Sequence, residues 1–214
     1  MASSIRILLV DDHPALRMGL RIVLEQTPDI HVVAEAGSGQ EALALIQALR
    51  PDVAVLDCQL PDMPGSQVAT ELYRLQLATR MLALSGHDSD DFLAAMHDAG
   101  AAGYLLKEAP VAAMVELICR VGRGETVWRP EQLARIAQWR AEVQRPWTSL
   151  TDRERDLLLA MSRGESNRDL ARRLLISERT VEFHISNVLG KLALPSRTAA
   201  VAWVKDHEVE RWGG

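Results

Sequence analysis

Short apolar runs recur along the first part of the chain, and polar stretches separate them. The runs cover residues 5–10, 31–36, 53–57, 81–85 and 103–106. Most of them are continuous rather than alternating, which is typical of parallel strands that are covered on both faces. The pattern therefore predicts five buried strands.

Helical patterns lie between these runs. Pro14 is suited to the first position of a helix, because its missing N–H would be unpaired there in any case. The sequence SGQE at residues 38–41 is a capping-box pattern that opens a second helix. Further helices are expected near residues 66–77, 90–99 and 110–121. The alternation predicts an α/β domain over residues 4–122, with a doubly wound, five-stranded parallel sheet.

Polar side chains follow four of the five predicted strands. Asp11 and Asp12 follow the first strand, Asp57 ends the third, Ser85 ends the fourth, and Lys107 follows the fifth. A single Asp in such a place is more often a helix cap or a turn former. In a doubly wound sheet, however, ligands bind at the carboxyl ends of the strands, so all five groups are expected at one edge. The carboxylates form an oxygen-rich pocket that suits Mg²⁺ together with a phosphoryl group.

The segments VDDHP, LDCQLPDMPG, LALSGHD and GYLLKEAP resemble the four signature segments of two-component receiver domains. The resemblance covers most of residues 4–122 and implies the flavodoxin-like strand order. It also implies that Asp57 is the phosphoacceptor. The implied Mg²⁺ ligands are Asp11, Asp12, Asp57 and the backbone carbonyl of Gln59.

The same resemblance assigns roles to three further residues. Lys107 and Ser85 would contact the phosphoryl group, and Ser85 and Tyr104 would form the activation switch. His13 could act as a general base, but a solvated or capping histidine is the simpler interpretation. Cys58 is expected to pack with its side chain directed away from Asp57.

The character of the chain changes over residues 123–147. Gly124, Pro130 and Pro146 interrupt the pattern, while residues 131–143 have the spacing of an amphipathic helix. This composition predicts a linker over residues 123–147 that contains one helix, with a break in the helical pattern before Pro146.

The C-terminal part reads as four short helices. TDRE at residues 151–154 and SNRD at residues 166–169 are capping-box patterns, and Ser177 and Ser196 are suited to cap two further helices. Only residues 175–177 separate the second helix from the third, which is the outline of a helix-turn-helix. From spacing alone, a helical module that binds another protein remains open.

The segment LTDRERDLLLAMSRGESNRDLARRLLISERTVEFHISNVLGKLAL resembles the LuxR-type helix-turn-helix along its whole length. With the receiver, the arrangement resembles the NarL/FixJ group of response regulators, with the DNA-binding domain at residues 148–212 and the recognition helix near residues 178–192. Glu182 would repel phosphates unless it accepts a hydrogen bond from a cytosine amino group. The candidate DNA-binding residues are Arg179, Thr180, Glu182, Phe183, His184, Ser186, Asn187, Lys191 and Arg197.

Composition and charge indicate the cellular compartment of the protein and the kind of partner it binds. The chain has two cysteines, Cys58 and Cys119, and they have no CxxC spacing. This predicts a protein of a reducing compartment, with neither a disulfide framework nor a zinc site. Because the chain has neither a secretory signal pattern nor a long apolar run, we expect a cytoplasmic protein without a membrane segment. The net charge of −5 is uneven: residues 145–214 carry 12 basic and 10 acidic side chains, against 12 and 19 in residues 1–144. A modestly basic C-terminal part is compatible with contact to nucleic acid.

The sequence thus predicts a DNA-binding response regulator that takes a phosphoryl group on Asp57 from a sensor histidine kinase. Its only catalysis would be its own phosphorylation and dephosphorylation, with Mg²⁺ as cofactor. The expected partners are the kinase, double-stranded DNA and a second copy of the chain, and RNA polymerase is a further candidate. Three alternatives stay open: a Mg²⁺-dependent phosphohydrolase, a regulator that acts through protein contacts, and a DNA-binding protein that is indifferent to phosphorylation.

Overall fold

The computed structural model describes residues 4–207 and 209. The chain divides into two compact units, and the boundary falls between Ala137 and Gln138. Each unit has its own buried apolar cluster. Because each unit has a core of its own, the two are described separately.

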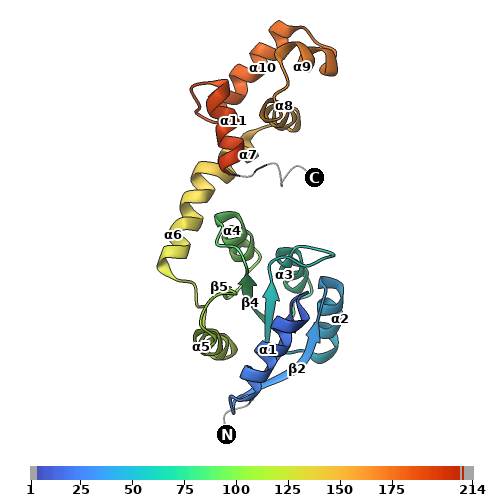
Figure 1. Cartoon of the computed structure of the whole chain (residues 1–214), viewed down its shortest axis with the longest axis vertical. Helices are drawn as coiled ribbons and strands as arrows, with labels where there is room; N and C mark the ends of the chain where they lie inside the picture. The colour runs from blue at the N-terminus through green and yellow to red at the C-terminus, as the bar shows by residue number, and fades with distance from the viewer. Residues whose placement is uncertain (1–3, 208, 210–214) are drawn as a thin grey trace. The chain divides into compact units, whose positions relative to one another are not determined.

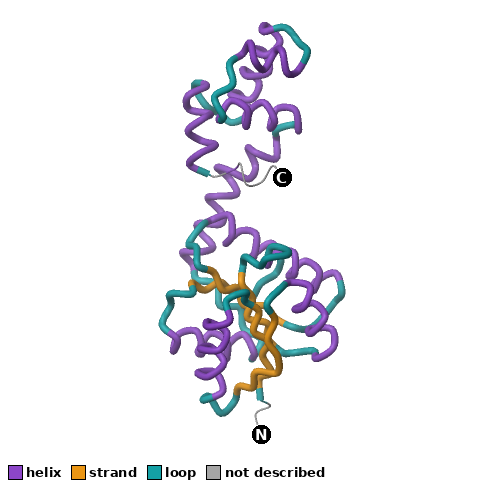
Figure 2. Tube along the Cα trace, turned by 45° about the vertical axis from the view of Figure 1, so that its right-hand side comes forward, coloured by secondary structure: helices purple, strands orange, loops and turns teal. Residues whose placement is uncertain are grey.

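The first unit is built on one parallel sheet, shown by the orange strands of Figure 2. Its strands lie in the order β2-β1-β3-β4-β5, and each neighbouring pair is parallel. The strand bounds are β1 Ile5–Val10, β2 Ile30–Ala36, β3 Val53–Asp57, β4 Arg80–Ser85 and β5 Gly103–Leu106. The prediction of a doubly wound, five-stranded parallel sheet is confirmed.

Helices cover both faces of this sheet (Figure 1). Their bounds are α1 Pro14–Glu25, α2 Gly39–Leu49, α3 Gly65–Arg74, α4 Asp90–Asp98 and α5 Val111–Gly122. Leu20 and Leu24 of α1 and Ile118 of α5 share one buried cluster with strand residues, whereas α3 contacts both α2 and α4. The continuous apolar strands are explained by this double cover, since neither face of the sheet meets water.

A helical segment follows the sheet and crosses the boundary between the units. It consists of α6 Pro130–Trp139, a π-helical stretch η1 at Arg140–Gln144, and α7 Arg145–Ser149. The stretch 123–147, predicted as a linker, is therefore divided between the two units. The expected break before Pro146 is wrong, because Pro146 lies inside α7. Proline crowds the carbonyl group four residues earlier, and the wider turn of the π-helix just before it accommodates this conflict.

The second unit is helical throughout its described part. Its helices are α8 Asp152–Ser162, α9 Asn167–Leu174, α10 Glu178–Lys191 and α11 Arg197–Asp206. Thr151 and Glu154 form a capping box at α8, and Ser166 and Asp169 form one at α9, as predicted. The all-α C-terminal domain is confirmed, and the strong caps explain why such short helices are stable.

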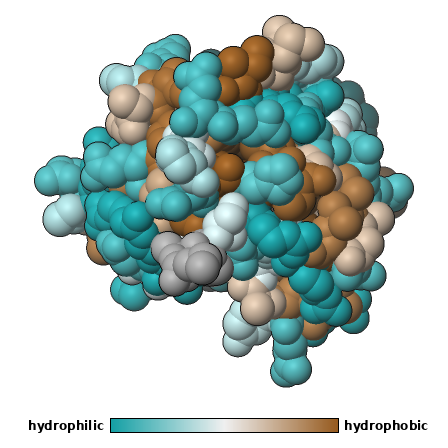
Figure 3. All heavy atoms as spheres, turned by 90° about the horizontal axis from the view of Figure 1, so that it is seen from below, coloured by the Kyte–Doolittle hydropathy of each residue, from teal (hydrophilic) through white to brown (hydrophobic). Residues whose placement is uncertain are grey.

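Exposed surface is mostly hydrophilic on the face seen in Figure 3, where hydrophobic patches lie between polar side chains. Among the described helices, none combines the length and the apolar character that crossing a lipid bilayer would need.

Candidate functional site

The register of the sheet places the polar residues at one edge. Val10 pairs with Leu56, and Asp57 pairs with Leu84, so β1, β3 and β4 end at nearly the same level. Ser85 in turn pairs with Leu106, the last residue of β5, and Lys107 follows directly. The structure thus brings the strand-end residues to a common edge.

Lys107 lies between two buried carboxylates. Its Nζ atom is 2.6 Å from Oδ2 of Asp57 and 2.7 Å from Oδ2 of Asp11. Only 3% of Asp57 and 2% of Asp11 are exposed. Charges of opposite sign at this distance, held away from water, attract each other far more strongly than a pair on the surface. Lys107 therefore offsets the repulsion between the two acids.

The same contacts shift the pKa values of these groups. Burial raises the pKa of Asp57, while the hydrogen bonds from Lys107 and from the backbone N–H of Gln59 oppose that rise. For Lys107, burial works against the charged form, but the carboxylates of Asp11 and Asp57 raise its pKa overall. The ammonium group is consequently held in its charged form at neutral pH.

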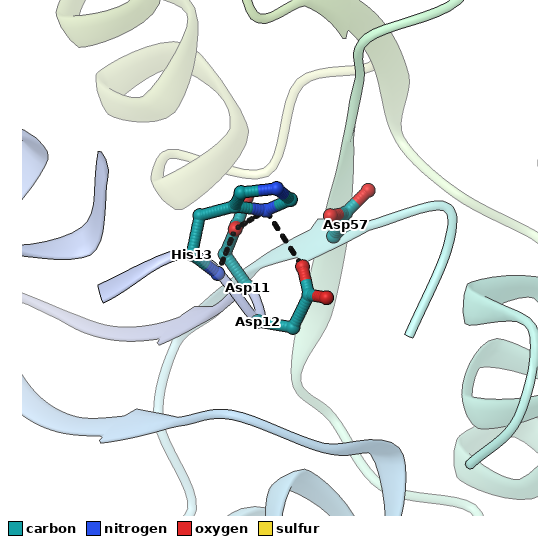
Figure 4. A group of neighbouring side chains, drawn as sticks. All are labelled: Asp11, Asp12, His13 and Asp57. Carbon is teal, nitrogen blue, oxygen red and sulfur yellow. Dashed lines mark hydrogen bonds and ion pairs between the residues drawn. The ribbon is translucent and has the colours of Figure 1, made fainter. Parts of the chain in front are cut away.

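Asp12 and His13 complete the acidic cluster (Figure 4). Nδ1 of His13 is 2.7 Å from Oδ1 of Asp12 and 3.0 Å from Oδ1 of Asp11. The side chain of His13 makes no capping hydrogen bond to α1. Its imidazole is exposed and faces the carboxylates, so the capping interpretation of this histidine is wrong, whereas the solvated one agrees with the structure.

The cluster can offer several ligand atoms to a cation. Asp11, Asp12, His13 and Asp57 each have one ligand atom within 4.8 Å of the others. An open cavity of about 510 Å³ is lined by Asp12, His13, Asp57 and Lys107, among other residues. Carboxylate oxygens in an open cavity suit a hard divalent cation that keeps some of its water.

Arg17 supports this cluster, although the sequence patterns did not single it out. Its guanidinium group donates to the carbonyl oxygen of Asp11 and pairs with Glu35 at 3.3 Å. Arg17 lies one helical turn after His13 on α1, and this spacing is the signal that could have identified it. The contact fixes the backbone just after β1.

The loop after Asp57 folds back tightly on the strand end. The N–H group of Gly65 donates to the carbonyl oxygen of Cys58, and Gln59 forms an isolated bridge with Pro64. A Cβ atom on Gly65 would lie 2.3 Å from the carbonyl oxygen of Asp57. Only glycine therefore allows this close approach of backbone to backbone.

Ser85 and Tyr104 meet at one backbone carbonyl group. Oγ of Ser85 donates to the carbonyl oxygen of His87 at 3.1 Å, and the hydroxyl of Tyr104 donates to the same oxygen at 2.6 Å. Tyr104 is buried, and burial raises the pKa of its hydroxyl. The two predicted switch residues are therefore joined through the loop between β4 and α4.

Cys58 takes no part in the acidic cluster. Its side chain is buried, and burial raises the pKa of the thiol to about 12. A thiol with so high a pKa is protonated and unreactive at neutral pH. The packing role predicted for Cys58 agrees with this environment.

The second unit contains the helix-turn-helix outline. Leu175 ends α9 in the left-handed conformation, with φ of 54°, and Ser177 caps α10 by accepting from the N–H of Thr180 at 3.1 Å. The side chain of Leu175 is exposed, so this tight turn presents an apolar residue to solvent. Two helices joined in this way can place the second one in a DNA groove.

One face of α10 is buried and the other is exposed. Val181, Ile185 and Val188 pack in the core of the unit. Phe183 stands out on the opposite face, because 62% of this large apolar residue is exposed. The predicted DNA-binding residues that are exposed are Arg179, Glu182, Phe183, Ser186 and Lys191, and those that are half-buried are Thr180, His184, Asn187 and Arg197.

Two of the predicted DNA-binding cations are held inside the unit. Nζ of Lys191 is 2.7 Å from Oε2 of Glu154, and Arg197 donates to Oδ1 of Asn167 at 2.9 Å and to the carbonyl oxygen of Glu165. Desolvation opposes the charge of Glu154, but its bonds to Lys191 and Thr151 lower its pKa. Both cations therefore stabilise the packing of the unit in addition to any external role.

Two family models match the chain. One, described as the response regulator receiver domain, matches residues 7–119, and the other, described as bacterial regulatory proteins of the luxR family, matches residues 148–204. Together they cover most of both units.

Similar proteins extend over nearly the whole chain. The nitrate/nitrite response regulator protein NarL of Escherichia coli (strain K12) is 35% identical over 207 residues, which are 95% of this chain and 96% of that protein. The DNA-binding transcriptional activator DevR/DosR of Mycobacterium tuberculosis (strain ATCC 25618 / H37Rv) is 37% identical over 205 residues, or 94% of each chain. The crystal structure of the response regulator ChrA of a heme-sensing two-component system matches with a TM-score of 0.57 and 35% identity, covering 97% of this chain and 99% of that one.

Proposed function

Because the chain belongs to the response regulators that join a receiver domain to a LuxR-type DNA-binding domain, we propose that a phosphoryl group on Asp57 controls DNA binding by α10. We assign residues 4–122 to the receiver, 123–147 to the linker and 148–212 to the DNA-binding domain. The observation that carries the proposal is the position of the Lys107 ammonium group, within 2.7 Å of the buried carboxylates of Asp11 and Asp57.

Asp57 is the proposed phosphoacceptor. A carboxylate oxygen of Asp57 attacks the phosphorus of a phosphohistidine on a sensor histidine kinase, or of a small acyl phosphate. The new O–P bond forms as the bond between phosphorus and the donor breaks, and the leaving imidazole or carboxylate takes that electron pair. Lys107 would offset the charge on the phosphoryl oxygens, and its contact with Oδ2 of Asp57 supports this role.

The residues of the pocket fit Mg²⁺. Its proposed ligands are Asp11, Asp12, Asp57 and the backbone carbonyl of Gln59, and the three carboxylates lie close enough together to share one ion. When bound, Mg²⁺ supplies positive charge next to the phosphoryl oxygens. The protein supplies the nucleophile and its position.

Ser85 and Tyr104 are the proposed switch. In the structure both donate to the carbonyl oxygen of His87. We expect the hydroxyl of Ser85 to turn towards a phosphoryl oxygen on Asp57, and the loop that carries His87 to move with it. Tyr104 follows because it is bonded to the same carbonyl group.

The exposed face of α10 is the proposed DNA-reading surface. Phe183 is suited to contact a thymine methyl group, and Glu182 is suited to accept from a cytosine amino group. Arg179, Ser186 and Asn187 are candidates for further contacts with bases or phosphates. Thr180, His184 and Arg197 are half-buried, and the exposed Lys191 is paired with Glu154. We assign these four residues to phosphate contacts or helix support.

Two copies of the chain would place two recognition helices on paired half-sites, as is usual for helix-turn-helix dimers. The similarity to DevR/DosR, a DNA-binding transcriptional activator, supports a role in transcription. We propose that the phosphorylated dimer acts on transcription with RNA polymerase as a further partner.

The test is selection of genomic DNA fragments by the purified full-length protein. Three samples are compared in Mg²⁺: wild type alone, wild type with beryllofluoride as a phosphoryl mimic, and Asp57→Ala with beryllofluoride. We expect enrichment of paired sites only in the second sample, because only there can the receiver take the phosphorylated form.

Other outcomes separate the alternatives. Equal enrichment in all three samples would keep the DNA-binding function and reject control by phosphorylation. Absence of enrichment in every sample would favour a regulator that acts through protein contacts. The carboxylate of Glu182, which would repel DNA phosphates, agrees with that alternative. Multiple turnover of a phosphate ester by wild type, lost in Asp57→Ala, would instead indicate a phosphohydrolase.

A further inference from the structure

Arg135 of α6 holds two acids that flank the start of α4. Its Nη1 atom is 2.6 Å from Oδ1 of Asp88, and its Nε atom donates to Oδ1 of Asp90 at 2.7 Å. Asp90 is the first residue of α4, where a negative charge is favoured by the helix dipole. One guanidinium group therefore joins α6 to the loop that leads from β4 into α4.

Gln132 fixes the same helix to β5. The residue is only 3% exposed, and its Nε2 atom donates to the carbonyl oxygen of Tyr104 at 3.1 Å. Its Oε1 atom accepts from the N–H of Arg129 at 3.0 Å. Ile136, one turn further along α6, is also buried. A buried amide with both ends bonded sets the position of α6 on the sheet, because any shift would leave polar atoms unpaired.

Trp128 extends this contact to the side chain of Tyr104. The two rings stack with their centroids 6.4 Å apart and their planes inclined by 25°. Nε1 of Trp128 donates to the carbonyl oxygen of Ala101 at 2.8 Å, and the N–H of Val127 donates to Ala102 at 2.7 Å. The segment before α6 therefore covers Tyr104. Trp128, Gln132 and Arg135 together form one row of contacts with the rest of the first unit, and Arg135 is the last of them along the chain.

This contact reaches the phosphoryl site through His87. The hydroxyl of Ser85 is committed to the carbonyl oxygen of His87, and His87 directly precedes Asp88, which Arg135 holds. For Ser85 to contact a phosphoryl group on Asp57, that hydroxyl must leave the His87 carbonyl and the loop must change. Arg135 binds the loop in the arrangement in which the Ser85 hydroxyl is bonded to the His87 carbonyl oxygen.

We propose that Arg135 is a positioning residue that opposes activation of the receiver, by holding the Asp88–Asp90 loop in the unphosphorylated arrangement. The proposal rests on the proposed function, because it assumes that Asp57 takes a phosphoryl group. A receiver held in this way binds a phosphoryl mimic only in the fraction of molecules whose loop is released, which weakens the apparent affinity. Removing the ion pairs therefore tightens binding of the mimic, by about threefold to tenfold for partly exposed pairs.

The test is a beryllofluoride titration of the full-length protein in Mg²⁺, followed by tryptophan fluorescence. Arg135→Ala is compared with wild type and with Arg129→Ala as the matched control. Arg129 is exposed, lies on the same segment, and its side chain has no ion pair within the described part of the chain. We expect Arg135→Ala to lower the midpoint by about threefold to tenfold, and Arg129→Ala to leave it within about 1.5-fold of wild type.

A double-mutant cycle separates positioning from a general loss of packing. Asp88→Asn should lower the midpoint by less than Arg135→Ala does, because Asp90 still binds Arg135. The double variant should add little to Arg135→Ala, because Arg135→Ala already removes the contact with Asp88. Arg135→Lys should fall between wild type and Arg135→Ala, since lysine keeps the charge but not the forked geometry.

Three results would overturn the assignment. They are an unchanged midpoint in Arg135→Ala, an equal shift in Arg129→Ala, and full additivity with Asp88→Asn. If beryllofluoride does not change the fluorescence of wild type, or changes that of Asp57→Ala equally, the proposed phosphoacceptor fails. That outcome is distinct from failure of the Arg135 assignment.

Discussion

The acidic pocket of the first unit and the exposed face of α10 place their functional groups in opposite ways. Asp11 and Asp57 are buried, and each contacts the ammonium group of Lys107. Glu182 and Phe183 are exposed, and Glu182 has no ion pair among the described residues. The buried acids of the pocket are paired within the unit, whereas Glu182 and Phe183 face solvent, where we propose that DNA contacts them. Substitutions should therefore have different consequences in the two regions.

The largest expected effect is that of Lys107→Ala. The substitution removes the ammonium group that contacts both the Asp11 and the Asp57 carboxylates. We expect the initial rate of phosphorylation by acetyl phosphate to fall by about 100-fold, as is typical when one group that stabilises transition-state charge is lost. The rate is measured from the fraction of phosphorylated protein over time, separated on gels in which the phosphorylated form migrates more slowly. Lys107→Arg, which keeps a cation, is the control, and a rate for Lys107→Ala within about threefold of wild type would contradict the assigned role.

Gly65→Ala should destabilise the first unit. The added Cβ would meet the carbonyl oxygen of Asp57 at 2.3 Å, so the loop after β3 must shift. We expect the free energy of unfolding of this unit to fall by about 2 kcal/mol, measured by urea denaturation.

Gly190→Ala is the matched comparison on α10. A Cβ on Gly190 meets no atom within 4 Å. Because alanine favours a helix more than glycine does, this change should stabilise the second unit by about 1 kcal/mol. Equal effects of the two substitutions would show that the Asp57 loop tolerates the shift.

Glu154→Gln should weaken the second unit in a pH-dependent way. Glu154 accepts hydrogen bonds from Thr151 and Lys191, and its pKa is lowered in the folded state. Its stabilising contribution is therefore fully present above the ordinary pKa of 4.5 and is lost as the pH falls through the lower, folded value. We expect Glu154→Gln to lower the free energy of unfolding by about 1–2 kcal/mol at pH 7.

Denaturation curves at several pH values check this expectation. The difference between wild type and Glu154→Gln should shrink as the pH falls below 4.5. A difference that stays constant over this range would mean that the carboxylate charge does not contribute.

The smallest expected effect concerns the exposed face of α10. Phe183→Ala should weaken binding to a selected DNA site by about fivefold, which corresponds to about 1 kcal/mol for one lost apolar contact. The thymines of the site are replaced with deoxyuridine one at a time, and each replacement removes one methyl group. One such replacement should weaken binding of wild type but not of Phe183→Ala, and an equal loss in both proteins would place the methyl contact elsewhere.

The strand ends were predictable because topology alone determines where they lie. Once five continuous apolar runs indicated a doubly wound sheet, Asp11, Asp57 and Lys107 had to reach one edge. The capping boxes at Thr151 and Ser166 were predictable for a similar reason, since both are local patterns of four residues.

Contacts between distant segments could not be read in this way. The pairing of Lys191 with Glu154 joins residues 37 positions apart, and Arg135 lies 47 positions from Asp88. Local patterns carry no information on such pairs. At Pro146 a local pattern gave a wrong prediction. Proline predicted a break, but the chain stays helical there because a π-helix precedes Pro146.

The carbonyl group at residue 87 has a consequence for sequence variation. The hydroxyl groups of Ser85 and Tyr104 both bond to the main chain of His87, not to its imidazole. Every amino acid provides a carbonyl oxygen, so substitution of residue 87 leaves the acceptor itself in place. The acceptor of the proposed switch therefore survives substitution of residue 87, whereas substitution of Ser85 or Tyr104 by a residue without a hydroxyl group removes one of the two hydrogen bonds. Any residue other than proline at position 87 would also keep the N–H group that donates to Ser85, so the main-chain connection would be preserved.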